Sequence, residues 1–174
     1  MKAKVCVMLA SVIVSTLILP LATADAASGT VCKTENGTLV FSPTLPDKPN
    51  KTVNTVAYWK GTFGGCNNGV TGGTFNMVQK IDNANCAMVA PLLSKQVTTG
   101  KITWKPTSNG TSTLRLTQAT TETHGTLHGT VTAGRFKGTQ VKMALVWAKL
   151  EPAGACATAG LKTAVFKSTA PVHI

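Results

Sequence analysis

Apolar and polar residues alternate with a period of two through most of the chain. Over residues 53–63 an apolar or small side chain occupies nearly every second position, with polar residues such as Asn54 and Lys60 between them. The same alternation recurs over 101–105, 113–117 and 126–132. Because successive side chains of a strand point to opposite faces, this pattern predicts β-strands with one buried face and one solvated face.

The segment 141–150 is apolar on both faces. Val141, Met143, Leu145 and Trp147 share one face, and small or branched residues such as Val146 share the other. This pattern predicts a strand that is central, or covered by a loop on its outer face. The one helix we expect is short, over residues 84–94, and is interrupted by Pro91.

Turn signals divide the chain into about eight or nine strands. They lie at residues 35–37, 43–49, 64–65, 67–69, 108–110, 124–125, 133–134 and 152–154. An antiparallel meander of this size closes into a barrel or folds into two packed sheets, and both have alternating faces. Because consecutive strands are joined mostly by short turns, the sequence predicts an all-β fold with a single antiparallel β-barrel. A β-sandwich is the alternative.

The first 26 residues have the pattern of a secretion signal peptide. Lys2 and Lys4 precede a largely apolar run over 5–19, and Ala24 and Ala26 are small residues suited to cleavage. We expect cleavage after Ala26 or Ala24, leaving a single antiparallel β domain at 27–174. No second apolar segment reaches the roughly 20 residues that span a bilayer. The product is expected to be secreted, in the extracellular space or associated with the cell envelope.

The chain is strongly basic. Its 174 residues include 17 Lys and Arg against 6 Asp and Glu, a net charge of +11. Without the two lysines and Asp25 of the predicted signal peptide, the net charge is +10. The lysines are dispersed, and no basic motif with interleaved aromatic residues predicts specific nucleic-acid binding. The expected partners are anionic cell-envelope polymers or lipid headgroups, attracted at long range.

Candidate catalytic residues are scarce, so the sequence favours a non-enzyme without a cofactor. The carboxylates of the predicted domain are isolated, and neither a Gly-x-Ser-x-Gly elbow nor a phosphate-binding loop occurs. Glu122, His124 and His128 share parity on one predicted hairpin and have a spacing that could hold a metal. Since His124 precedes a turn glycine and His128 lies among threonines, we interpret both as solvated and expect no metal site.

Four cysteines, Cys32, Cys66, Cys86 and Cys156, remain in the predicted domain. An even number of widely spaced cysteines in an exported protein predicts two disulfides. Three pairings are possible. If the first two strands pair around the loop at 43–51, Cys32 lies near Cys66, which leaves Cys86 for Cys156.

Trp59, Trp104 and Trp147 all occupy predicted inward-facing positions. We interpret them as core residues, in which case Trp147→Ala costs about 3–5 kcal/mol of stability. The alternative is that some of them line a cavity for a small apolar ligand, which a barrel of about eight strands can just hold.

Several short motifs resemble a group of small exported β-rich proteins from mycobacteria and related actinobacteria. They are Trp59-x-Gly61-x-Phe63-x-Gly65-Cys66, Ile102-Thr103-Trp104, Gly129-x-Val131-x-x-Gly134-x-Phe136-x-Gly138, and a last cysteine before a Thr/Ala-rich strand. The resemblance covers most of the predicted domain and implies the fold and export. That group has no assigned activity, so no functional residue is carried over.

The sequence therefore predicts a secreted, disulfide-stabilised β-barrel that acts as a binding or surface-interaction module. One alternative is an extracellular protease inhibitor that presents the loop at 43–51 to a protease. A further alternative is a small extracellular hydrolase that uses His124 or His128.

Overall fold

The computed structural model describes residues 28–174 except 89–91, 95, 122 and 153. The predicted signal peptide at 1–26 and Pro91 of the predicted helix lie outside the described residues. Among the described residues, no helix is long and apolar enough to cross a membrane.

Strands form most of the described chain. They are β1 (Val31–Leu45), β2 (Val53–Cys66), β3 (Gly72–Ala84), β4 (Thr98–Lys105), β5 (Thr111–Thr120), β6 (His124–Gly134), β7 (Gln140–Glu151), β8 (Leu161–Ser168) and β9 (Val172–His173). A short 3-10 helix, η1 (Thr107–Asn109), follows β4, and a four-residue helix, α2 (Ala155–Thr158), precedes β8. The predicted all-β class is confirmed.

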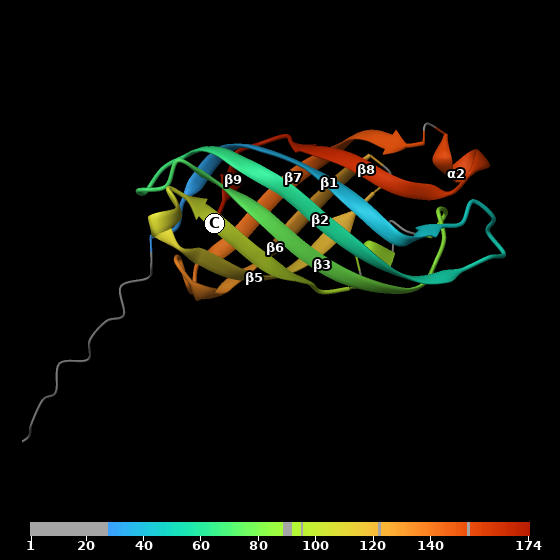
Figure 1. Ribbon diagram of the computed structural model, residues 1–174, viewed down its shortest axis with the longest axis horizontal. Coiled ribbons are helices and arrows are strands. Elements are labelled where there is room, and N and C mark those ends of the chain that lie inside the picture. Colours follow the sequence, from blue (N-terminus) through green and yellow to red (C-terminus); the bar gives the residue numbers. More distant parts are fainter. Residues whose placement is uncertain (1–27, 89–91, 95, 122, 153) are drawn as a thin grey trace, which may run out of the picture.

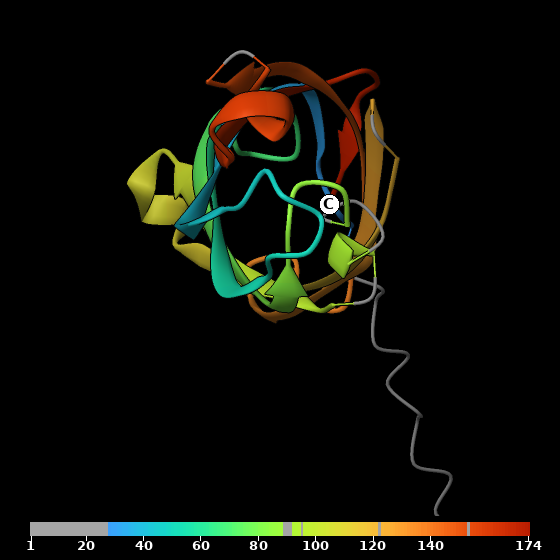
Figure 2. The same cartoon turned by 90° about the vertical axis from the view of Figure 1, so that its right-hand side faces the viewer.

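The first eight strands close into an antiparallel barrel (Figures 1 and 2). Each strand from β1 to β7 pairs with the next along the chain, and β8 pairs with β1 through partners such as Gly37 and Phe166. The ninth strand lies between β7 and β1, where His173 pairs with both Val31 and Lys142. The barrel prediction is therefore confirmed over the β-sandwich alternative.

Two disulfides fasten the barrel. Cys32 on β1 lies directly opposite Cys66 on β2 and is bonded to it, so the pairing follows from the strand register. Cys86, in the turn after β3, is bonded to Cys156 in α2. This is the pairing that the register of the first two strands favours.

Several local predictions need correction. The turns predicted at 35–37, 64–65, 124–125 and 133–134 are wrong, because these residues lie within β1, β2 and β6, where pairing with neighbouring strands decides the conformation. The outer face of 141–150 is not covered, since Val146 is half-buried and Ala148 is exposed. A closed barrel has no central strand, and small or branched residues are tolerated on a solvated pleat. Of the helix predicted at 84–94, the described part forms a turn at 86–88 and is helical only at 92–93.

A continuous series of aromatic contacts fills much of the barrel interior. It runs from Trp147 through Phe166, Phe75, Phe63 and Trp104 to Phe136, with neighbouring ring centroids 4.9–6.3 Å apart. Five of these rings lie at inward-facing positions of β2, β3, β4, β7 and β8, and Phe136 lies in the turn after β6. Alternation along the strands therefore brings rings from distant parts of the sequence together. The interior around this series is therefore a packed core.

Two glycines make room for these rings. Gly37 on β1 lies opposite Gly61 on β2, and both belong to the inner face of the barrel. A Cβ on Gly61 would collide with the Asn36 carbonyl oxygen and the Phe75 ring, and one on Gly37 would collide with the Phe166 ring. The rings therefore lie directly over the glycine backbone.

We expect Gly61→Ala to lower the free energy of unfolding by about 1–3 kcal/mol, because its methyl group overpacks the core against backbone that cannot move freely. Thr62→Ala is the control, since Thr62 is the next residue of β2 and is exposed. Surface changes of this kind alter stability by roughly 0.5 kcal/mol or less. Urea unfolding measures both. Equal effects of the two changes would contradict the packing role of Gly61.

Candidate ligand-binding cavity

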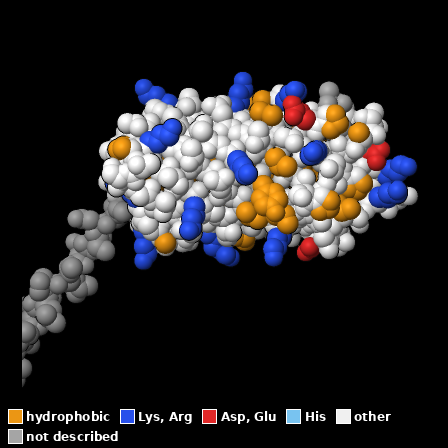
Figure 3. All heavy atoms as spheres, in the orientation of Figure 1, with side chains coloured by type: hydrophobic (Ala, Val, Ile, Leu, Met, Phe, Trp, Pro, Cys, Tyr) orange, Lys and Arg blue, Asp and Glu red, His pale blue; other side chains and the backbone are white. Residues whose placement is uncertain are grey.

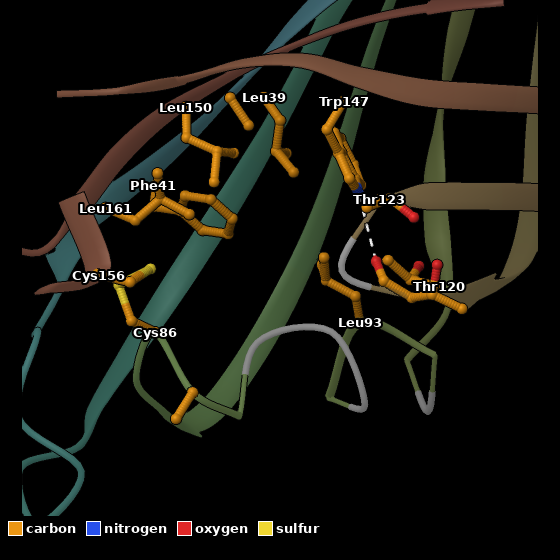
Figure 4. A pocket seen from close by; sticks show the side chains of 13 residues that line it. Leu39, Phe41, Cys86, Leu93, Thr120, Thr123, Trp147, Leu150, Cys156 and Leu161 are labelled. Atoms are coloured by element: carbon orange, nitrogen blue, oxygen red, sulfur yellow. Dashed lines mark hydrogen bonds between the residues drawn. A yellow bond between two sulfur atoms is a disulfide. The ribbon is translucent and has the colours of Figure 1, made fainter. Parts of the chain in front are cut away.

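A cavity of about 440 Å³ opens at the end of the barrel that carries α2, and we call it the α2-end cavity (Figure 4). Its walls come from the inner faces of β1, β7 and β8 and from the loops that follow β3 and β5. On β1, Leu39 and Phe41 point inward while Val40 between them points outward. The volume lies within the range of about 300–1,000 Å³ that small-molecule sites occupy.

The Cys86–Cys156 disulfide forms part of the cavity wall. Figure 4 shows it opposite Leu93, with Phe41 and Leu161 beside it. The segment containing Leu93 is held by Gln79 of β3, whose Nε2 donates to the Leu93 carbonyl oxygen at 2.8 Å and to the Gln96 carbonyl oxygen at 3.3 Å. The Cys86–Cys156 disulfide and the buried Gln79 amide therefore hold in place the two parts of the cavity wall that are not formed by strands.

The three tryptophans do not share one environment. Trp59 and Trp104 are buried at 1% and 0% exposure and belong to the packed core, as the core interpretation predicts. Trp147 is half-buried and lines the α2-end cavity, as the ligand alternative predicts. Its Nε1 donates to the Thr121 carbonyl oxygen at 3.4 Å, and its ring centroid lies 5.9 Å from that of Trp59.

Among the described residues, those that line the cavity are mostly apolar and none of them is charged. Aliphatic and aromatic residues form most of the wall, and Thr120, Thr121 and Thr123 supply polar groups at one side. Burying a charged group without a partner costs several kcal/mol, so such a site favours an uncharged apolar molecule. Hydroxyl and carbonyl groups at the threonines could orient one polar end of it.

Glu35 is a buried carboxylic acid inside the barrel. Its side chain is 1% exposed, and its Oε2 has no hydrogen-bond partner among the described residues. Its backbone N–H donates to Ser168 Oγ at 3.0 Å, and its partner in the register of β2 is Phe63. Desolvation raises the pKa of Glu35 from 4.5 to about 8. The carboxyl is therefore protonated at neutral pH.

His124 and His128 are not lining residues of the cavity, although His124 contacts Thr121 and Thr123, which are. His124 and His128 are exposed on β6, and His124 Nδ1 lies 2.7 Å from Thr123 Oγ1. Glu122, the third member of the spacing considered in the sequence, lies outside the described residues. Within the part of the chain that the structure describes, no three His, Cys, Asp or Glu side chains gather as a metal site.

The chain matches no protein family model, no curated protein and no solved structure. The geometry of the barrel and its cavity is therefore the basis for a functional proposal.

Trp147→Ala should cost less stability than Trp59→Ala, because Trp147 has packed neighbours on one side and the cavity on the other. We expect about 3–5 kcal/mol for the fully buried Trp59 and less than about 3 kcal/mol for Trp147. Urea unfolding of the two variants measures the difference. A larger loss for Trp147→Ala would show that the cavity wall is packed as tightly as the core.

Glu35→Gln should remove a pH dependence of stability. Between pH 5 and 8 the unfolded chain loses the Glu35 proton and the folded chain keeps it, because the pKa of Glu35 rises to about 8 on folding. The free energy of unfolding of the wild type then falls as pH rises, by up to about 1.4 kcal/mol per pH unit. Below pH 4.5 both states bind the proton and this slope disappears.

The measurement is the urea midpoint of wild type and Glu35→Gln at several pH values between 4 and 9. Exposed Asp82 supplies the control variant Asp82→Asn, which should keep the wild-type slope. Identical slopes in wild type and Glu35→Gln would mean that the Glu35 carboxyl is solvated or paired in the folded protein.

Proposed function

We propose that the protein is an exported binding module that holds a small, uncharged apolar molecule in the α2-end cavity. The single observation that carries this proposal is a cavity of about 440 Å³, walled mostly by apolar side chains, at the end of the barrel where the aromatic core stops. Apolar concave sites with a few polar groups are the usual form of small-molecule sites.

The two disulfides support the location that the proposal requires. They are consistent with an oxidising compartment outside the cell, where they constrain the unfolded chain and add stability. The Cys86–Cys156 bond has a second role in this proposal, since it fixes one wall of the binding site. An exported module of this kind resembles the actinobacterial proteins whose motifs the chain shares.

A fluorescent, uncharged apolar dye tests the proposal. The wild type should take up the dye stoichiometrically, and Cys86→Ala/Cys156→Ala should weaken uptake at least about tenfold, because one wall of the cavity is released. The matched control is Cys32→Ala/Cys66→Ala, which removes a disulfide distant from the cavity lining and should leave uptake nearly unchanged.

The two double variants should lose similar stability. Their disulfides close loops with separations of 70 and 34 residues, worth about 4 kcal/mol each in the chain-entropy model. Circular dichroism must show that both variants are folded at the temperature of the titration. Equal loss of uptake in both variants would contradict a site at the α2 end. Absence of uptake by the wild type, with a stable complex with a protease instead, would favour an inhibitor.

A further inference from the structure

An apolar row crosses the outside of the barrel. Val40 on β1 lies opposite Tyr58 on β2, which lies opposite Val78 on β3. All three side chains are on the outer face, where Tyr58 is 38% and Val78 is 40% exposed. We call these three residues the Tyr58 row. Figure 3 shows apolar side chains gathered on this wall, among blue basic side chains.

Basic residues lie on both sides of the Tyr58 row. On one side, Lys60 of β2 lies opposite Asn76 of β3, which lies opposite Lys101 of β4. On the other side Lys80 of β3 lies opposite half-buried Val56. Exposed lysines therefore lie on both sides of the Tyr58 row, two residues away from it along β2 and β3.

The cross-strand line of the Tyr58 row continues to a basic residue on one side and to Glu151 on the other, where Val40 lies opposite Thr163 and Thr163 lies opposite Glu151. Val78 lies opposite Thr99 on β4, and Thr99 lies opposite exposed Arg115 on β5. Asp82, two residues beyond Lys80, is the acidic side chain that β2 to β5 expose. Among the described residues the ion pair within 4 Å joins Lys149 and Glu151, so Lys60, Lys80, Lys101 and Arg115 form no such pair with a described carboxylate.

We propose that this face docks on an anionic lipid surface, with Tyr58 and Val78 entering the interface and the basic residues contacting headgroup phosphates. Each Lys or Arg near an anionic membrane adds to the attraction, and buried apolar area strengthens it further. Tyrosine suits the position because its ring prefers the apolar side of the boundary and its hydroxyl the aqueous side.

The apolar row distinguishes a lipid surface from a soluble polyanion. A wall polymer or polyphosphate would neutralise the lysines, but it offers nothing apolar to cover Tyr58 and Val78. A lipid surface satisfies both features with one partner. The position also fits the proposed ligand, since Val40 lies between Leu39 and Phe41, which line the α2-end cavity on the inside of the same wall.

Sedimentation with vesicles of phosphatidylglycerol and phosphatidylcholine tests the docking face. We expect wild-type protein to sediment with the mixed vesicles and to remain in solution with pure phosphatidylcholine. Tyr58→Ser/Val78→Thr, which keeps residues tolerated in strands, should lower the partition coefficient about tenfold. Lys60→Gln/Lys80→Gln should lower it by a similar factor.

Each variant has a matched control elsewhere on the barrel. Val146→Thr changes a half-buried outer residue of β7, four strands away from β3, and Lys142→Gln/Lys167→Gln removes two exposed lysines from β7 and β8. Both controls should bind vesicles within about twofold of wild type, since these residues lie outside the docking face and their long-range attraction is screened at physiological ionic strength.

Two results would overturn the proposal. Equal weakening by Lys60→Gln/Lys80→Gln and Lys142→Gln/Lys167→Gln would show attraction to net charge and no defined face. Binding to soluble polyphosphate that is as strong as vesicle binding, and unchanged in Tyr58→Ser/Val78→Thr, would assign the face to a polyanion. Dye uptake in solution by Tyr58→Ser/Val78→Thr should equal that of wild type, so failure of the cavity proposal is detected separately.

Discussion

The limited volume inside an eight-stranded barrel is the constraint on which the other features depend. Such a barrel is just wide enough for side chains to fill it, and here large rings fill much of it. They fit only because Gly37 and Gly61 leave the backbone bare beneath Phe166 and Phe75. The series of rings ends at Trp147, which contacts Phe166 on one side and borders the α2-end cavity on the other. The cavity therefore lies where the aromatic packing stops.

The same constraint explains how Glu35 is tolerated. Its side chain shares the inner face of β1 with Leu39 and Phe41, and water is largely excluded there. A carboxyl in that position keeps its proton, which avoids the large cost of an unpaired buried charge. The stability of the barrel is then highest in mildly acidic solution as far as this group is concerned, and the cost of keeping the proton grows with pH.

Alternating patterns in the sequence predicted the strands, the closed barrel and the inward positions of Trp59 and Trp104, because those features follow from local periodicity and short turns. The turn predicted at 35–37 failed because the glycine that favours a turn is used in β1 to admit a ring. A cavity lined by a tryptophan was an alternative in the sequence, but its place in the barrel could not be predicted, since Leu93, Cys86 and Cys156 lie in segments without strand periodicity. Burial of Glu35 had one available signal, its parity with Leu39 and Phe41, which the turn interpretation obscured.

The inner and outer faces of β1 and β2 connect the two proposals physically. Strand alternation obliges Val40 to face outward if Leu39 and Phe41 face the cavity, and it obliges Tyr58 to face outward if Ala57 and Trp59 face the core. A single branched residue is tolerated on a solvated strand, but a row of apolar residues across three neighbouring strands is unusual there. Here valine and tyrosine occupy those outer positions, while the lysines lie two residues away along β2 and β3. The two proposals therefore place the lipid-docking row and the apolar cavity on opposite faces of one wall, with lysines on either side of the row.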